Sequence, residues 1–173
     1  MASKLTGLSD DEQVMRVMYW EATGEGLLGK ALVGRTLWNR FDIVQQGNPS
    51  VFNAKGKSIL HLISAKKQYE TFSNKRVNRP IPEKDREEVE EALRLSKDMS
   101  LLTDALVNSG VSEEDAGLLV YATGFRTPDA YKDSSQLEGN VTPYKNHVFN
   151  NAGAPDTEKL GQSFTPSLPG ISK

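Results

Sequence analysis

Residues 21–40 read EATGEGLLGKALVGRTLWNR, in which glycines separate a leading acidic residue from a second apolar periodic segment. The preceding segment, residues 12–20, carries Val14 and Met18 four positions apart, which is the spacing of one helical face. We therefore expect a helix that ends at Glu21, a break at the glycines, and a second helix after it. Evidence for strands is thin elsewhere in the chain, so the sequence predicts a mainly α domain.

Glu21 is the best candidate for a catalytic acid in this arrangement. A carboxyl group held where one helix stops against another can lose part of its hydration and keep its proton near neutral pH. A different interpretation also fits, because Glu21 and Glu25 lie four positions apart and on one continuous helix would form a mildly repulsive, solvated pair. Spacing alone leaves both interpretations open.

Short motifs continue in order along the chain after this segment. They are EATGE at residues 21–25 with Gly29 and Asn39-Arg40, Gln68 with Phe72-Ser73, ATGFRTP at residues 122–128, and NHVF at residues 146–149. As an ordered set, covering roughly residues 12–150, they resemble the cell wall hydrolase family that includes the spore-cortex-lytic enzymes of the SleB and CwlJ type. Relative to the family's Gln-Phe-Ser element, three residues are inserted after Gln68.

The chain also departs from the family pattern at single positions. Gly124 and Arg126 stand where the family commonly has histidines, and Asn150 stands where it usually has a tyrosine. Arg126 can replace an imidazole as a donor to hydroxylated or anionic sugars, because its planar guanidinium offers five N–H groups. The sequence therefore resembles a divergent member of the family.

The resemblance implies a lysozyme-like, SleB-like fold of the α+β class, with a small β hairpin near residues 66–76. It also implies cleavage of the bond between N-acetylmuramic acid and N-acetylglucosamine in peptidoglycan, in a cleft beside the end of the first helix. The site residues are then Glu21 as the catalytic acid, Glu25 as a supporting carboxylate, and, for sugar binding, Phe72, Ser73, Tyr121, Thr123, Phe125, Arg126 and His147. Glu25 is expected to cap the second helix or to orient the turn, with a side-chain oxygen that accepts backbone N–H groups.

The mechanism has two versions. In a lytic transglycosylase, one acid protonates the leaving oxygen and then assists attack of the muramoyl C6 hydroxyl on C1, without water. A hydrolytic muramidase usually needs a second carboxylate about 5 to 9.5 Å from the first; the candidates are Glu25, Asp129, Asp133 and Glu138. None of them stands out, so the single-acid version suits the sequence better. For Tyr121, a buried structural role is open as well.

Composition agrees with one domain, since 173 residues with 37% hydrophobic and 25% charged side chains can form one sizeable core. The absence of cysteine excludes disulfides, thiolate catalysis and cysteine-ligated zinc. Because His61 and His147 are the only imidazoles, we expect neither a metal site nor a cofactor. His61 is expected to be a half-buried helix residue.

The net charge of −2 is unevenly distributed: residues 1–79 carry 12 basic and 7 acidic side chains, and residues 80–173 carry 9 and 16. A basic first half suits an anionic polymer, and peptidoglycan qualifies as well as nucleic acid does. Because the lysines lack interleaved aromatic residues and a nucleic-acid motif, no nucleic-acid partner is expected. A solvated face is the first interpretation of these charges, and a role toward a sugar polymer is the second.

Further helices are predicted at residues 58–65, 83–99 and 112–121. Residues 1–150 form the expected peptidoglycan-cleaving domain. Residues 151–173, rich in proline and glycine, are expected to be an extended or mobile tail.

We expect no signal peptide, because residues 1–4 are not followed by an apolar segment, and the sequence contains no apolar run of about 18 residues. We therefore expect a monomer without membrane insertion, made in the cytoplasm and brought to the wall by phage lysis, a virion or a secretion system. Two other classes stay open. A non-catalytic wall-binding or virion structural protein of the same fold would need no acid at Glu21, and a nucleic-acid-binding module would rest on the basic first half alone.

Overall fold

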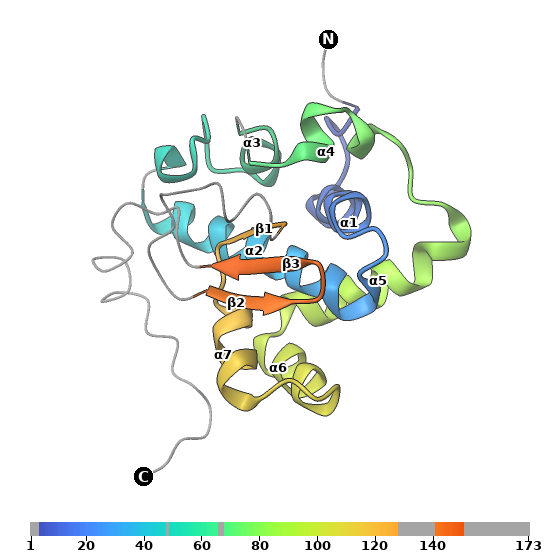
Figure 1. The fold of residues 1–173 in the computed structure, drawn as a ribbon. Helices are drawn as coiled ribbons and strands as arrows, with labels where there is room; N and C mark the ends of the chain where they lie inside the picture. The colour runs from blue at the N-terminus through green and yellow to red at the C-terminus, as the bar shows by residue number, and fades with distance from the viewer. Residues whose placement is uncertain (1–3, 48, 66–67, 128–140, 151–173) are drawn as a thin grey trace.

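The computed structural model describes residues 4–47, 49–65, 68–127 and 141–150. In chain order its elements are α1 (Asp10–Glu21), α2 (Gly26–Gln46), η1 (Pro49–Phe52), α3 (Ile59–Ile63), α4 (Glu70–Ser73), η2 (Arg76–Asn78), α5 (Glu83–Lys97), α6 (Met99–Asn108), α7 (Glu113–Val120), β1 (Gly124–Arg126), β2 (Val141–Tyr144) and β3 (His147–Asn150), where η marks a 3₁₀ helix. The fold is mainly helical with a small antiparallel sheet, which confirms the predicted fold class (Figure 1).

The first two helices form where the sequence predicts them, with a break at the glycines. The side chain of Ser9 accepts a hydrogen bond from the backbone N–H of Glu12 at 3.2 Å and so caps α1. At its other end, α1 stops at Glu21, where the N–H of Ala22 makes the last bond to Met18. The continuous-helix interpretation of residues 21–25 is therefore wrong.

Helix α2 is central to the core and contacts α1, α3, α5, α6 and α7. Residues 29–37 of α2 are all buried. At Gly34 the helices approach so closely that an added Cβ would lie 2.7 Å from Met18 Sδ of α1 and 3.0 Å from Ser96 Cβ of α5. This close packing fixes α1 and α2 relative to each other, and with them the break that carries Glu21.

The predicted helix over residues 83–99 is two elements. Helix α5 ends at Lys97, and Asp98 caps α6 by accepting a hydrogen bond from the N–H of Leu101 at 3.0 Å. Asp98 turns the chain because its carboxylate satisfies an N–H that a continuing helix would bind internally. Helix α7 begins after Ser112, as predicted, and that side chain accepts from the N–H of Asp115 at 3.1 Å.

Helices α3 and α4 and the short η2 form a layer that contacts α1, in the upper part of Figure 1. Helix α3 confirms the short helix predicted near residues 58–65. The β hairpin predicted near residues 66–76 is wrong, because the described part, residues 68–76, forms α4 and enters η2. Thr71 and Tyr69 favour strands by intrinsic preference, but here both are buried against other helices, and such tertiary contacts decide.

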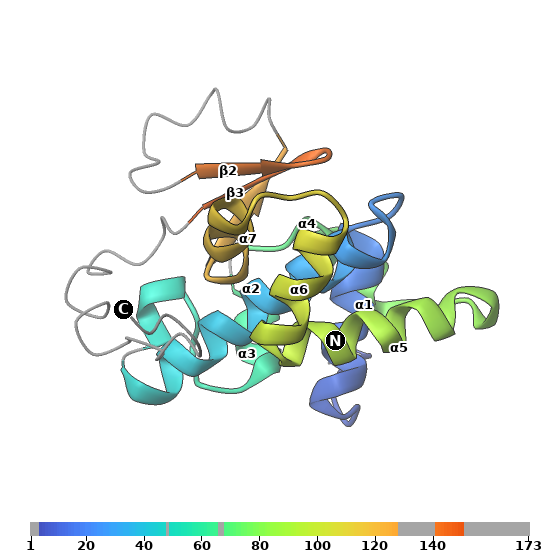
Figure 2. The ribbon, with the colours of Figure 1, turned by 90° about the horizontal axis from the view of Figure 1, so that it is seen from below.

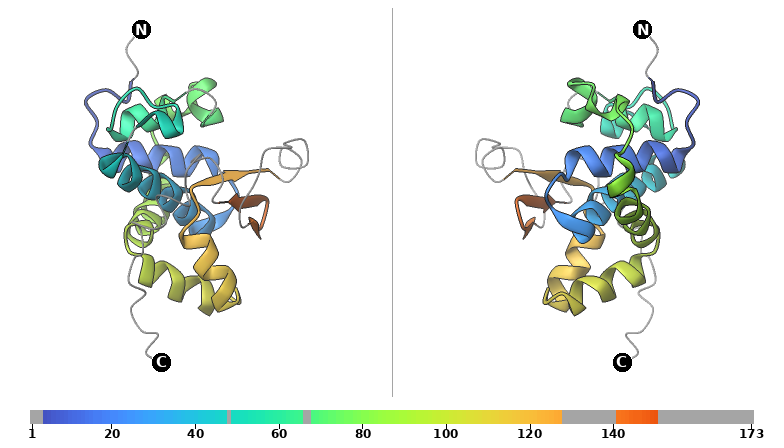
Figure 3. Two further views of the ribbon diagram at one scale, coloured as in Figure 1. Left: turned by 90° about the vertical axis from the view of Figure 1, so that its left-hand side faces the viewer. Right: turned by 90° about the vertical axis from the view of Figure 1, so that its right-hand side faces the viewer.

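The sheet is built from the end of the described chain. Its order is β1-β3-β2, all antiparallel, with Phe125 opposite Phe149 and Tyr144 opposite His147. A two-residue turn joins β2 to β3, and Lys145 in that turn has a left-handed φ of 51°. Seen from below, the sheet lies to one side of the helices (Figure 2), and the two side views show the same separation (Figure 3).

Among the residues that the structure describes, no helix has the length and apolar character needed to cross a membrane. The tail expected at residues 151–173 lies outside the described residues, so this part of the predicted domain division stays a prediction.

Candidate active site

Glu21 is half-buried at the last position of α1 and is held by α4. Its Oε1 accepts a hydrogen bond from the backbone N–H of Thr71 at 2.8 Å and a second from Thr71 Oγ1 at 2.7 Å. Thr71 is itself buried, so this donor pair cannot easily turn away. Two donors on one oxygen fix the orientation of this carboxyl group.

Glu25, four residues later, has a different environment. Its side chain is only 3% exposed. Its Oε2 accepts a hydrogen bond from the backbone N–H of Asn146 at 3.3 Å, and His147 Nδ1 lies 3.6 Å from its Oε1. Lys145 Nζ also donates to the backbone carbonyl of Glu25 at 2.5 Å. Glu25 therefore anchors the turn between β2 and β3 to the start of α2.

The prediction that Glu25 caps α2 is wrong, although it does accept a backbone N–H. Glu25 occupies the N-cap position, but its side chain makes no capping hydrogen bond to α2. The turn of the hairpin supplies the donor instead. Gly29 permits this conformation, since a Cβ there would lie 2.4 Å from Glu25 Cβ.

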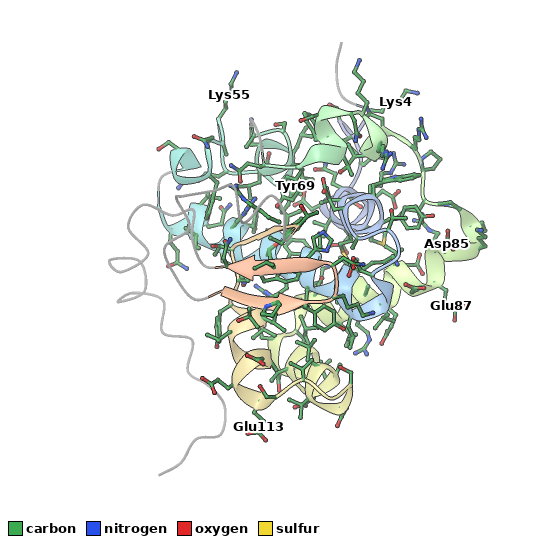
Figure 4. All side chains as sticks on the ribbon, in the orientation of Figure 1. Lys4, Lys55, Tyr69, Asp85, Glu87 and Glu113 are labelled. Atoms are coloured by element: carbon green, nitrogen blue, oxygen red, sulfur yellow. The ribbon has the colours of Figure 1, made fainter. Side chains whose placement is uncertain are left out.

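A row of rings connects the surroundings of the two carboxylates. Tyr69 and Phe125 have ring centres 6.2 Å apart, and Phe125 meets His147 edge-on at 5.3 Å. Burial raises the pKa of Tyr69, Arg40 opposes this shift, and the negative charge of Glu21 adds to it. Tyr69 is thus near Glu21 at one end of the row, and His147 is beside Glu25 at the other. Tyr69 is labelled in Figure 4, between the α3–α4 layer and the sheet.

Arg40 of α2, 8% exposed, holds the segment that leads into β1. Its Nε donates to the carbonyl of Thr123 and its Nη1 donates to the hydroxyl of Tyr69 at 3.2 Å. The guanidinium also lies 5.3 Å from the ring centre of Phe52 and 5.4 Å from that of Tyr69. One buried cation therefore joins α2, the entrance to β1 and the residue before α4.

Asn39, next to Arg40, fixes the end of α7 in the same way. Its Nδ2 donates to the carbonyls of Val120 and Ala122 at 2.9 and 2.8 Å. The Asn39-Arg40 pair was identified in the sequence only as part of a motif, and Thr71 and Tyr69 were not identified as site residues at all. A usable signal was present, because polar residues in the buried interior of α2 need buried partners.

The structure brings some predicted sugar-binding residues to this site. Phe125 and His147 belong to the ring row, and Thr123 is bound by Arg40. Thr123 Oγ1 is buried and has no hydrogen-bond partner among the described residues. Phe72 is half-buried on α4 against the core, and Ser73, exposed, donates to the carbonyl of Tyr69 at 3.3 Å.

Two other predicted residues do not belong to the ring row. Tyr121 lies directly after α7, near Arg35 of α2, and the guanidinium of Arg35 donates to the carbonyl of Ser96 in α5. Burial raises the pKa of Tyr121. Arg126 is exposed at the end of β1, opposite Val148. His61 is exposed rather than half-buried, and its Nδ1 pairs with Ser58 Oγ at 2.7 Å.

Three of the candidate second carboxylates, Asp129, Asp133 and Glu138, lie outside the described residues. Within the described part of the chain, no three acidic or histidine side chains are grouped as a metal site would require. Burial lowers the pKa of His147, and the nearby Glu25 acts in the opposite direction. Among the candidate carboxylates that the structure describes, Glu21 accepts bonds from Thr71 and Glu25 accepts one from the hairpin turn.

Comparisons of the chain with protein-family models, curated proteins and solved structures find no match.

Proposed function

We propose that this protein cleaves peptidoglycan glycan strands between N-acetylmuramic acid and N-acetylglucosamine, as a lytic transglycosylase with Glu21 as its catalytic acid. The observation that carries the proposal is the environment of Glu21, a half-buried carboxyl group at a helix end whose Oε1 is held by both donors of Thr71. A general acid must be fixed and also reachable by the substrate, and this combination satisfies both needs.

The reaction that we assign to Glu21 has two proton transfers. First, the proton of the Glu21 carboxyl group passes to the glycosidic oxygen as the bond from that oxygen to muramoyl C1 breaks. The carboxylate then accepts the proton of the muramoyl C6 hydroxyl while that oxygen bonds to C1. The carboxyl group ends in its starting protonation state, and no water is consumed.

The environment of Glu25 supports the single-acid version. Its 3% exposure and its bonds to the hairpin turn leave little access for a sugar or for a water that attacks one. A structural role fits this carboxylate better than that of nucleophile or base. Phe125 and His147 are suited to contact sugar rings, because aromatic faces pack against the C–H groups of sugars.

The products of digestion test this proposal. Purified sacculi treated with the protein should release muropeptides that end in 1,6-anhydro-muramic acid, which mass spectrometry detects as a product lighter than the reducing sugar by one water. The variant Glu21→Gln should release none above background, and the matched variant Glu113→Gln, at an exposed carboxylate of α7, should act like the parent.

Reducing-end muramic acid as the main product would contradict transglycosylation. It would favour a hydrolytic muramidase of the same fold, and Asp129, Asp133 and Glu138 would be the first positions to test for the second carboxylate. Binding to sacculi with no released product at any enzyme concentration would favour the non-catalytic wall-binding protein instead.

A further inference from the structure

Basic side chains are frequent in the segment that contains α3, α4 and η2, where they lie in the loop before α3 and at η2 and its two ends. Residues 53–80 contain seven basic residues and one acidic residue. The described basic side chains there are all exposed, and Lys4 joins them because its backbone N–H donates to Asn78 Oδ1 at 3.2 Å. We call this set the basic layer; it consists of Lys4, Lys55, Lys57, Lys75, Arg76 and Arg79.

The basic layer differs from the other basic side chains in its lack of acidic partners. Within the described ranges, none of its six members forms a salt bridge, whereas Arg86 and Arg94 of α5 pair with Glu12 and Glu91 at 2.8 and 2.7 Å. Figure 4 shows Lys4 and Lys55 at the upper edge of the molecule, both directed away from its body. Unpaired like charges repel one another, so this surface is suited to an anionic partner.

We propose that the basic layer binds the carboxylates of the peptides that peptidoglycan carries on its glycan strands. This inference rests on the proposed function, because it concerns how the same substrate is held. Part of the basic layer lies close to Glu21: η2, which carries Arg76, contacts both α1 and α4, and Trp20, the neighbour of Glu21, donates to the carbonyl of Arg79 at 3.2 Å. A glycan strand that reaches Glu21 therefore carries its peptides past this layer.

The chemistry of the layer argues against two other anionic partners. Single-stranded nucleic acid is bound through aromatic stacking as well as charge, but the exposed described residues of 53–80 include no Phe, Tyr or Trp. Attachment to a membrane surface usually adds exposed apolar side chains. Leu101 on α6, outside the layer, is the one large exposed hydrophobic residue among the described residues. A surface of separated lysines and arginines, without exposed aromatic or large apolar side chains, fits carboxylates that are spaced along a polymer.

The test is a sedimentation assay with insoluble sacculi and the Glu21→Gln protein, which binds without digesting. The triple variant Lys4→Gln, Lys75→Gln and Arg76→Gln, made in that background, should bind at least tenfold more weakly, since each close charge contact in water changes affinity by about fivefold. Sacculi whose peptide carboxylates have been converted to amides should bind the parent as weakly as intact sacculi bind the triple variant. The matched variant Arg94→Gln, at an exposed arginine already paired with Glu91, should bind like the parent.

Equal binding of the parent to intact and amidated sacculi would overturn the proposal. So would a triple variant that binds intact sacculi like the parent while its melting temperature is unchanged. Stronger binding to anionic phospholipid vesicles or single-stranded DNA than to sacculi, lost in the triple variant, would assign the layer to those partners instead. These outcomes are separate from failure of the proposed function, which appears as an absence of released muropeptides from the protein with Glu21 intact.

Discussion

The end of α1 and the start of α2 each present a glutamate, four positions apart, yet the two regions differ in what holds the carboxylate. Glu21 is bound by Thr71, 50 positions away in α4, and stays half-exposed. Glu25 is bound by the turn of the hairpin, 121 positions away at Asn146, and is covered. The distant segment that reaches each residue, rather than its place in the motif, therefore decides which carboxylate stays partly exposed and which one is covered.

The largest effect is expected at Glu21. Glu21→Gln should lower wall-degrading activity by about 10² to 10⁴, because it removes the acid. The melting temperature should stay near that of the parent, since the amide oxygen can still accept the bonds from Thr71. Turbidity clearance of permeabilised cells measures the rate, with Glu113→Gln as the control. Clearance by Glu21→Gln at nearly the parental rate would show that Glu21 is not the acid.

Glu25→Gln should differ from Glu21→Gln by lowering stability more and activity less. It removes a buried charge from the N–H of Asn146 and from His147, which should lower the free energy of unfolding by about 1 to 3 kcal/mol. Activity should fall less than in Glu21→Gln. Denaturant melts and the same turbidity assay give both values. If Glu25→Gln lost more activity than Glu21→Gln, the two roles would have to be exchanged.

Thr71 is the next position to test, because its two donors hold the carboxyl group of Glu21 and not that of Glu25. Thr71→Val removes the hydroxyl donor but keeps the N–H, and activity should fall by about tenfold, the equivalent of one lost hydrogen bond. Thr71→Ser keeps the hydroxyl and should retain most activity. Initial rates on sacculi distinguish the two variants. Equal rates for Thr71→Val and the parent would mean that the hydroxyl does not position the acid.

The smallest effect is expected at His147, beside the turn between β2 and β3, and concerns how stability depends on pH. Burial lowers the pKa of His147 below the value of about 6.5 found in unfolded chains, so the unfolded chain binds this proton first as the pH falls. The contribution of neutral His147 to stability is therefore present above about pH 6.5 and is lost as the pH falls through the folded pKa.

His147→Gln should consequently show a shallower fall in melting temperature than the parent between about pH 8 and pH 5. The matched variant is His61→Gln, at an exposed position on α3. It should keep the slope of the parent. Identical slopes for His147→Gln and the parent would show that docking of the hairpin does not depend on this imidazole.

Local signals in the sequence account for much of the helical fold. Ser112 acts as a cap where the sequence predicts a helix start, and α1 ends before the glycines that follow Glu21. The break between α5 and α6 at Asp98 does not follow from the sequence, because a carboxylate inside a helical pattern can be either a solvated residue or a cap. The hydrogen bond from the N–H of Leu101 shows that Asp98 is a cap.

The sheet and the contacts of the site were harder to predict. Strand β3 has three consecutive buried residues rather than alternating ones, so it lacks the period of two that marks a half-buried strand. Glu21 could be found from its place at the helix end. Its partner Thr71 and the clamp made by Arg40 arise from pairings across long stretches of chain, which spacing in the sequence does not report.

The strand order of the sheet has a consequence for synthesis. β3 is made last of the three described strands but lies in the middle, so among these strands β1 finds its hydrogen-bonded neighbour only when β3 has been translated. At about 5 to 20 residues per second, the ribosome needs roughly one to five seconds to pass from the end of β1 to the end of β3. During that interval Glu21 is present in the nascent chain, but Glu25 has not met Asn146. A chain released before Asn150 would carry Glu21 and lack the strand that joins β1 to β2, so translation through β3 becomes a condition for assembly of the sheet beside Glu25.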